Sequence, residues 1–186
     1  MGTSYSSVIN MEDKPVIIAE TPRIIIRHFC VNDFVELAPI LASPKVMKYS
    51  LSGVLTSDRT QKFISKMLVR YKLEGYGYYA IIHREHKQLI GYCGLLLCSL
   101  EEDKTVEIGY RLNPTYWGKG LATEAAIAIR DYAWEKLSLN YLIALIQPKN
   151  IASIKVAKKI GMKWERNYVF MGMLVRIYQI FKLKQD

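Results

Sequence analysis

Hydrophobic residues recur along the chain at two spacings, one typical of strands and the other of helices. Residues 23–29 are rich in β-branched side chains, which predicts a first strand. In residues 34–41 the apolar positions repeat every three or four residues, which predicts a helix with Asn32 as its N-cap. The same spacing from about residue 57 predicts a second helix, and this helix should end at Gly75.

After Gly75 the pattern predicts three consecutive strands, followed by alternating strands and helices. The predicted strands are 78–83, 89–97, 106–112, 141–147, 163–170 and 174–183. A long helix is expected over about 119–137, and a short one between Asn150, its N-cap, and Gly161, its left-handed stop. Because a helix joins the strands 106–112 and 141–147, at least one parallel pairing is expected, in a fold of the mixed α+β class.

Length and composition fit one ordinary globular domain. The chain has 186 residues, of which 51% are hydrophobic and 23% charged, values that exclude a wholly disordered protein. Residues 1–15 are polar and aperiodic, so we expect a flexible lead-in over 1–19 and a single domain over 20–186. Neither an internal repeat nor a linker divides that domain.

Cysteine content, hydropathy and charge indicate in which compartment the protein works and which classes of partner it can bind. Three cysteines cannot form a closed disulfide framework, so a reduced, cytoplasmic protein is expected. The longest uncharged runs, 89–100 and 137–148, have 12 residues each, too few to span a bilayer. The formal net charge of +9 affects which partners the protein can attract, but it carries no information about the fold.

The segment most informative about chemistry lies where a predicted strand passes into the long helix. Gly118 and Gly120 flank Lys119 there, and glycines allow positive φ angles and close approach of a ligand to the backbone. The first amides of the following helix would be unpaired, which suits a pyrophosphate. A surface turn would explain the same glycines. The segment is neither a Walker A loop nor a dinucleotide-binding loop, because it lacks the residues that either motif requires.

The same segment resembles the acetyl-CoA-binding motif of the GNAT superfamily of N-acetyltransferases, Q/R-x-x-G-x-G/A. Trp117 takes the first position, Gly120 the fourth and Ala122 the sixth, and a tryptophan at the first position is familiar in the RimJ/RimL-type branch. Other segments similar to that branch follow in order: TPRIIIR (21–27), SPKVMKY (43–49), VEIGYRL (106–112), NIASIKVAKKIGM (150–162) and VRIYQIFKL (175–183).

The resemblance implies a GNAT fold and acetyl-CoA as cosubstrate. The sheet would have six to seven mostly antiparallel strands, flanked by about four helices and splayed between its fourth and fifth strands, 106–112 and 141–147. The backbone of Arg111 and Leu112 would bond pantetheine, and Asn150 would bond the same arm, cap its helix, or do both. The segment Trp117, Gly118, Lys119, Gly120, Leu121, Ala122 and Thr123 would hold the pyrophosphate.

Two residues are candidates for the chemistry of transfer. The resemblance places a general base at Glu107, although a structural carboxylate paired with Arg111 is the alternative. Position 157 is alanine, where many family members have a tyrosine that protonates the leaving thiolate. Ser153 could take that role or be an ordinary residue of the first helical turn, and Tyr110 or Tyr116 remains open.

The resulting hypothesis is direct acetyl transfer from acetyl-CoA to a primary amine, most plausibly a protein N-terminal α-amine. The alternatives are a small amine, amino sugar or polyamine as acceptor, and a non-catalytic acyl-CoA-binding module. The resemblance also allows a homodimer. Direct nucleic-acid binding is not expected, because a repeated basic–aromatic pattern is missing, and no membrane partner is expected. No metal is expected either, since His83 and His86 lack a third ligand in the sequence.

Overall fold

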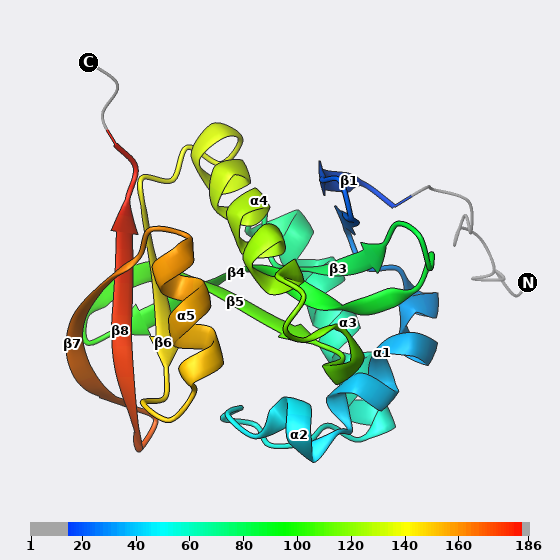
Figure 1. The fold of residues 1–186 in the computed structure, drawn as a ribbon, viewed down its shortest axis with the longest axis horizontal. Coiled ribbons are helices and arrows are strands. Elements are labelled where there is room, and N and C mark those ends of the chain that lie inside the picture. Colours follow the sequence, from blue (N-terminus) through cyan, green and yellow to red (C-terminus); the bar gives the residue numbers. More distant parts are fainter. Residues whose placement is uncertain (1–14, 184–186) are drawn as a thin grey trace, which may run out of the picture.

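The strands form one sheet whose order departs from chain order only at its C-terminal end. The computed structural model describes residues 15–183. The strands are β1 (Ile17–Glu20), β2 (Ile24–Arg27), β3 (Tyr78–His83), β4 (Leu89–Leu100), β5 (Asp103–Leu112), β6 (Tyr141–Ile146), β7 (Lys163–Phe170) and β8 (Met173–Phe181). Within the described residues these eight strands pair in the order β1–β2–β3–β4–β5–β6–β8–β7 (Figure 1). Only β5 and β6 are parallel neighbours, so the expected mixed, mostly antiparallel sheet is confirmed.

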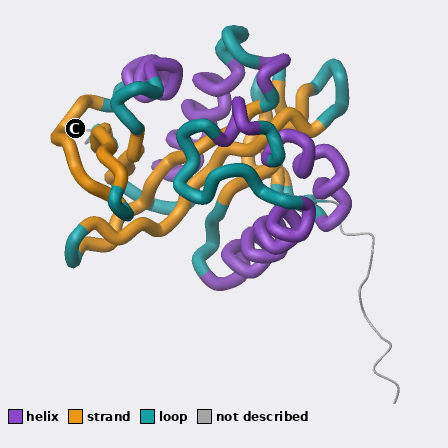
Figure 2. The backbone as a smooth tube through the Cα atoms, turned by 90° about the horizontal axis from the view of Figure 1, so that it is seen from below, coloured by secondary structure: helices purple, strands orange, loops and turns teal. Residues whose placement is uncertain are grey.

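Helices cover both faces of this sheet (Figure 2). The described helices are α1 (Phe34–Leu41), α2 (Pro44–Met47), α3 (Ser57–Leu73), α4 (Leu121–Glu135) and α5 (Ile151–Lys159), with 3-10 turns at Val31–Asp33 and Pro114–Tyr116. The helices α1 and α3 pack on one face with Ala80 and Tyr92, whereas α4 and α5 pack on the other with Val106 and Ile108. Along β5, successive side chains therefore alternate between two separate hydrophobic cores.

The N-terminal part of the sheet differs from the sequence prediction. The predicted strand 23–29 is confirmed as β2, but it pairs with a further strand, β1, across a tight turn in which the N–H of Thr21 donates to the carbonyl of Ile24 at 3.0 Å. Ile17–Ala19, assigned above to the lead-in, belong to β1, and this added edge strand raises the predicted six or seven strands to eight. Residues 1–14 of the predicted lead-in lie outside the described residues.

The first helix also begins differently from the prediction. Asn32 is not the N-cap, because it lies inside the 3-10 turn that precedes α1. The backbone N–H of Cys30 donates to Asp33 at 2.8 Å, and the Asp33 carboxylate forms a two-pronged ion pair with Arg27. Asp33, one position later, is the N-cap residue of α1, and its carboxylate bonds the preceding turn and Arg27 rather than the helix amides.

At the C-terminal end of the chain the predicted helix boundaries are confirmed. Asn150 caps α5, since its side chain accepts the N–H of Ser153 at 3.2 Å, and Gly161 follows the helix with a φ of +92°. The one-turn helix α2 was not predicted, because four residues starting at Pro44 are too few to show a periodicity. Within residues 15–183, no helix has both the length and the apolar character needed to cross a membrane.

Candidate active site

The two parallel strands at the centre of the sheet separate almost as soon as they meet. A single residue pair, Glu107 on β5 and Ile143 on β6, joins them in register. Both strands continue beyond this pair, β5 to Leu112 and β6 to Ile146, without pairing to each other again. This is the expected splay, displaced to the fifth and sixth strands by the extra N-terminal strand. It leaves unpaired backbone edges that another extended molecule can bond.

A cavity of about 530 Å³ opens beside these separated strands. The end of β5, the loop before α4, the first turn of α4, the first half of α5 and the α2 segment all contribute to its walls. The lining residues are Lys45, Val46, Lys48, Tyr49, Tyr110, Arg111, Leu112, Tyr116, Trp117, Gly118, Gly120, Leu121, Ala122, Thr123, Asn150, Ala152, Ser153, Lys155, Val156 and Lys159. The structure thus brings together all but one of the residues expected to bind the cofactor; Lys119 does not line the cavity.

The N-terminus of α4 faces this cavity with free backbone amides. Gly118 and Gly120 have φ angles of +74° and +80°, which glycine adopts without strain. The first helical hydrogen bond runs from Glu124 to the carbonyl of Gly120, so the amides of Leu121, Ala122 and Thr123 lack helical partners. The positive end of the helix macrodipole lies at the same place, and together these features form an anion site.

Side chains on the outer side of the loop hold it in position. Although burial would raise the pKa of Glu124, hydrogen bonds from Thr21 and Arg23 hold this pKa below its usual value. Arg23 also donates to the carbonyl of Lys119 at 2.8 Å, and the Lys119 ammonium lies 5.4 Å from the ring centre of Tyr116. The backbone carbonyl of Lys119 therefore helps to hold the loop, while its side chain lies over Tyr116 and does not itself line the cavity.

Trp117 connects the loop to the end of β5. Its indole N–H donates to the carbonyl of Leu112 at 2.7 Å, so this carbonyl already has one partner before any pantetheine amide arrives. The ammonium of Lys45, on α2, lies 5.4 Å from the Trp117 ring centre. The tryptophan at the first motif position thus fixes the loop against the strand and carries a cation on its ring.

Lysines outside the glycine motif supply positive charge to the cavity. Lys45 and Lys48 come from the α2 segment, and Lys155 and Lys159 come from α5. None of these four lysines was among the predicted cofactor-binding residues, because a lysine on a short helix is ordinarily a solvated surface residue. Their i, i+3 and i, i+4 spacings were the available signal, since such spacings place both members of a pair on one helix face.

Tyr110, Asn150 and Ser153 meet where α5 begins. Capping of the helix by Asn150 is shown, and its amide also reaches the cavity wall, so contact with a pantetheine arm stays a prediction. The phenol of Tyr110 donates to the backbone carbonyl of Ser153 at 3.4 Å. Burial raises the pKa of Tyr110 to about 12. Its phenol therefore keeps its proton at neutral pH and can donate it.

Glu107 occupies the point at which β5 and β6 part. Burial raises the pKa of Glu107 to about 7, although a hydrogen bond from the N–H of Leu145 and the positive charge of Arg111 both lower it. Within residues 15–183 Glu107 takes part in no ion pair, so the alternative of a carboxylate paired with Arg111 has no contact to support it. A carboxylate with this pKa can accept a proton near neutral pH.

The two catalytic candidates lie on opposite sides of the sheet. Glu107, Gly109 and Arg111 share the face covered by α1 and α3, whereas Ser153 belongs to α5 on the other face. A side chain at Gly109 would collide with the phenol of Tyr78, because a Cβ there would lie 2.7 Å from its oxygen. Tyr78 therefore lies over β5 between Glu107 and Arg111, and the two candidates can act on one molecule only through the gap between the strands.

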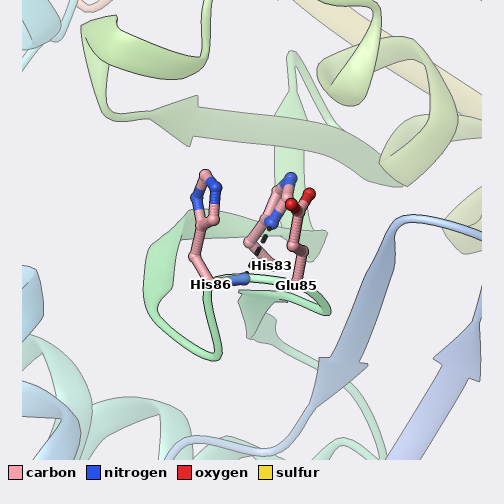
Figure 3. A group of neighbouring side chains, drawn as sticks. All are labelled: His83, Glu85 and His86. Carbon is pink, nitrogen blue, oxygen red and sulfur yellow. Dashed lines mark hydrogen bonds between the residues drawn. The ribbon is translucent and has the colours of Figure 1, made fainter.

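A cluster of potential metal ligands lies on the β3–β4 hairpin, outside the cavity lining but in contact with Tyr116. The sequence offered His83 and His86, and the structure adds Glu85, with the ligand atoms of all three within 4.8 Å of one another (Figure 3). The two imidazole rings stack with centroids 4.3 Å apart and an angle of 25° between their planes. His86 is also bonded to the phenol of Tyr116 at 2.7 Å. Nδ1 of His83 accepts the backbone N–H of His86 at 3.3 Å, and the expectation of no metal stays a prediction.

Comparison with known proteins decides the family. The model of the acetyltransferase (GNAT) domain matches residues 23–163. The chain belongs to this GNAT acetyltransferase family. A curated relative, the "Uncharacterized N-acetyltransferase YnaD" of Bacillus subtilis, is 36% identical over 145 residues, which are 78% of this chain and 82% of the relative. GNAT membership makes the protein an acetyl-CoA-dependent N-acetyltransferase.

Solved GNAT structures agree with the fold described above. The acetyltransferase (GNAT family) from Bacillus anthracis is 30% identical, with a TM-score of 0.75 over 87% of this chain and 96% of that one. The structure of "RimL- Ribosomal L7/L12 alpha-N-protein acetyltransferase in complex with Coenzyme A" gives a TM-score of 0.76 over 89% of this chain and 97% of that one, at 18% identity. This second likeness shows the fold alone.

The cavity suits the parts of acetyl-CoA in the order in which they are connected. The α4 amides and the four lysines match the phosphates, because backbone N–H groups and ammonium groups both bind phosphate oxygens. The unpaired edges of β5 and β6 offer backbone partners to the two amides of pantetheine. Glu107 lies where these edges meet, outside the residues that line the cavity.

Proposed function

We propose that this GNAT enzyme is of the RimJ/RimL type and transfers the acetyl group to a protein N-terminal α-amine. The observation that carries the proposal is the position of Glu107, a carboxylate with a pKa near 7 at the end of the β5–β6 pairing. The ordered sequence segments similar to the RimJ/RimL branch support the type of acceptor. An α-amine has a pKa near ~8, so a base of this strength is adequate to receive its proton.

The chemical step needs no covalent enzyme intermediate. Glu107, directly or through a water molecule, takes a proton from the amine while the nitrogen lone pair forms the new bond to the thioester carbon. The bond between this carbon and sulfur then breaks, and its electron pair leaves with the CoA sulfur. Tyr110 or Ser153, which both line the cavity, supplies the proton that converts this thiolate to the thiol.

Binding groups contribute by holding the two reactants in place. The α4 amides fix the phosphates, and the backbone of Arg111 and the Asn150 amide fix pantetheine, so that the thioester lies at the gap. Orientation of this kind converts an encounter between two molecules into a reaction within one complex, and it can supply roughly 7–11 kcal/mol of rate acceleration.

An acceptor-panel assay tests the proposal. Free thiol released from acetyl-CoA is measured with peptides bearing free N-termini, the same peptides with blocked N-termini, and a set of small amines, amino sugars and polyamines. Turnover only with free N-termini supports the proposal, while turnover only with small amines selects the alternative acceptor class. Binding of acetyl-CoA without turnover of any amine would leave the non-catalytic acyl-CoA-binding module.

A further inference from the structure

Arg111 carries a positive charge with which no carboxylate of the described residues is in direct contact. Its side chain is partly buried on β5 and lines the cavity. One terminal nitrogen of its guanidinium donates to the carbonyl of Tyr110 at 2.9 Å, and its buried Nε has no partner. Within residues 15–183, no carboxylate forms an ion pair with it. Buried guanidinium groups are normally paired, so this one calls for an anion from outside the chain.

The positive charge of Arg111 acts on Glu107 and on the tyrosines near it. Among the cationic residues that line the cavity, only Arg111 contributes to the pKa of Glu107, which it lowers. It likewise lowers the pKa of Tyr78 and of Tyr92, its cross-strand neighbour on β4. The phosphates of acetyl-CoA have a separate set of partners in the α4 amides and the lysines. Arg111 is therefore placed to meet the acceptor.

The face that holds Glu107 and Arg111 keeps the two charges apart. They stand four residues apart on one strand, with the phenol of Tyr78 over Gly109 between them. An acceptor whose amine reaches Glu107 would extend back toward Arg111, which is the member of this pair that lines the cavity. An acceptor without negative charge would bring its ammonium form toward an uncompensated cation, which disfavours a polyamine.

We infer that Arg111 binds a carboxylate of the acceptor, so that the substrate is an amine whose own residue carries a carboxylate group. This inference rests on the proposed acetyl transfer and names its substrate class. Either a free α-amino acid or a peptide with an acidic N-terminal residue supplies this chemistry. Arginine suits it because the planar guanidinium can bond both oxygens of a carboxylate. The bound carboxylate would also cancel the field that lowers the pKa of Glu107, which strengthens the base when substrate is present.

The test compares matched acceptors that differ only in one negative charge. Free glutamine is compared with its α-amide, and a peptide beginning with glutamate with the same peptide beginning with glutamine. Loss of a charged hydrogen bond predicts that kcat/KM falls about 10- to 100-fold when the carboxylate is removed. The first pair detects an amino acid as the source of the carboxylate and the second pair detects a peptide.

Variants assign the preference to one side chain. In Arg111→Gln the acidic and neutral acceptors should become equal, and Arg111→Lys should restore part of the preference, because it keeps the charge but not the two-pronged geometry. Lys104→Gln removes the same charge from an exposed position of the same strand and should keep the full preference. Acetyl-CoA affinity and the melting temperature, measured for each variant, establish that the fold and the cofactor site are intact.

Three outcomes would overturn the inference. The wild-type enzyme could acetylate amines without preferring the acidic acceptor, the preference could survive in Arg111→Gln, or Arg111→Gln could lower acetyl-CoA affinity and leave the ratio between acceptors unchanged. The last result would show that Arg111 binds acetyl-CoA rather than the acceptor. Failure to acetylate any amine would refute the proposed function itself, whereas turnover without preference refutes only the role of Arg111.

Discussion

At the scale of single residues, burial sets the proton affinity of the groups beside the gap between β5 and β6. It raises the pKa of Glu107 to about 7 and that of Tyr110 to about 12. Both shifts favour the protonated form: the carboxylate becomes a stronger base, and the phenol becomes a weaker acid that stays protonated at neutral pH. One group suited to accept a proton and one suited to give a proton thus lie near the same gap.

Replacing Glu107 by glutamine should lower turnover by about 10²- to 10⁴-fold with little change in acetyl-CoA affinity, because the shape is kept and the proton acceptor is lost. The pH dependence follows from the raised pKa, since Glu107 must be ionised and the amine must be neutral. Below about pH 7 the logarithm of kcat/KM should rise with pH with a slope of about 2 in the wild type and about 1 in the variant. Initial rates between pH 5.5 and 9 measure both slopes.

The two candidate proton donors can be separated by their hydroxyl groups. Tyr110→Phe should slow turnover about 10-fold if the phenol protonates the departing thiolate, and Ser153→Ala should slow it less. Because Tyr110→Phe also removes the hydrogen bond to the carbonyl of Ser153, acetyl-CoA affinity and the melting temperature serve as controls. A thiol-release assay compares them. Equal activity of Tyr110→Phe and the wild type would exclude the phenol and leave Ser153 or water as the donor.

At the scale of elements, the sequence predicted most strands and helices but fewer of the short connections. Strand 163–170 was predicted with the observed bounds, because its ends are marked by turns. The strand β2 was predicted, but β1 was missed, since a four-residue edge strand is too short to show a pattern of its own in the sequence. The cap at Asn32 was wrong because burial and the ion pair with Arg27 favour Asp33, and neither can be seen in a linear sequence.

In the candidate site, too, the sequence predicted the residues whose geometry is set by near neighbours and missed those brought together by tertiary packing. Residues in the glycine motif could be found from the sequence, because their backbone geometry depends on near neighbours. The lysines of α2 could not, since the cavity that they line forms only when α2 packs near α4 and α5. The isolation of Arg111 was also out of reach, because it depends on which carboxylates fail to reach it in three dimensions.

The N-terminus of α4 should bind phosphate through its backbone rather than through Lys119. Gly120→Asp places a carboxylate beside the free amides and should weaken acetyl-CoA binding by at least about 100-fold, because both charge repulsion and lost contacts act together. Lys119→Ala should change affinity less than about 3-fold, since this side chain does not line the cavity. Isothermal titration calorimetry measures both affinities.

A matched control for Gly120→Asp exists in the β7–β8 turn. Gly172 has a φ of +79°, nearly that of Gly120, and a Cβ there would meet no atom within 4 Å. Gly172→Asp should therefore cost a similar amount of backbone strain without affecting acetyl-CoA binding. If Lys119→Ala is as damaging as Gly120→Asp while both variants remain folded, the side-chain charge, not the backbone, holds the phosphates.

At the scale of the whole molecule, the sheet consists of two parts that meet at one residue pair. The first part contains β1 to β5, and the second contains β6, β8 and β7 with α5 beside them (Figure 1). Beyond Glu107 and Ile143 no ladder joins the parts, and the cavity beside this gap has walls from both. A molecule bound there acts as an added connection between the two parts of the sheet.

Acetyl-CoA should therefore stabilise the protein and tighten the junction between its two parts. At a ligand concentration about 100-fold above Kd, binding to the folded state alone adds about 2.7 kcal/mol to the free energy of unfolding. For a chain of this length, that gain raises the melting temperature by roughly 5–10 °C. Hydrogen exchange should slow in β6 and α5 as well as at the start of α4, because the ligand contacts both parts of the sheet.

Gly120→Asp, which should not bind acetyl-CoA, should show neither the thermal shift nor the slower exchange. Protection confined to the start of α4 would mean that pantetheine does not enter the gap, and no thermal shift at millimolar acetyl-CoA would contradict the cofactor site altogether.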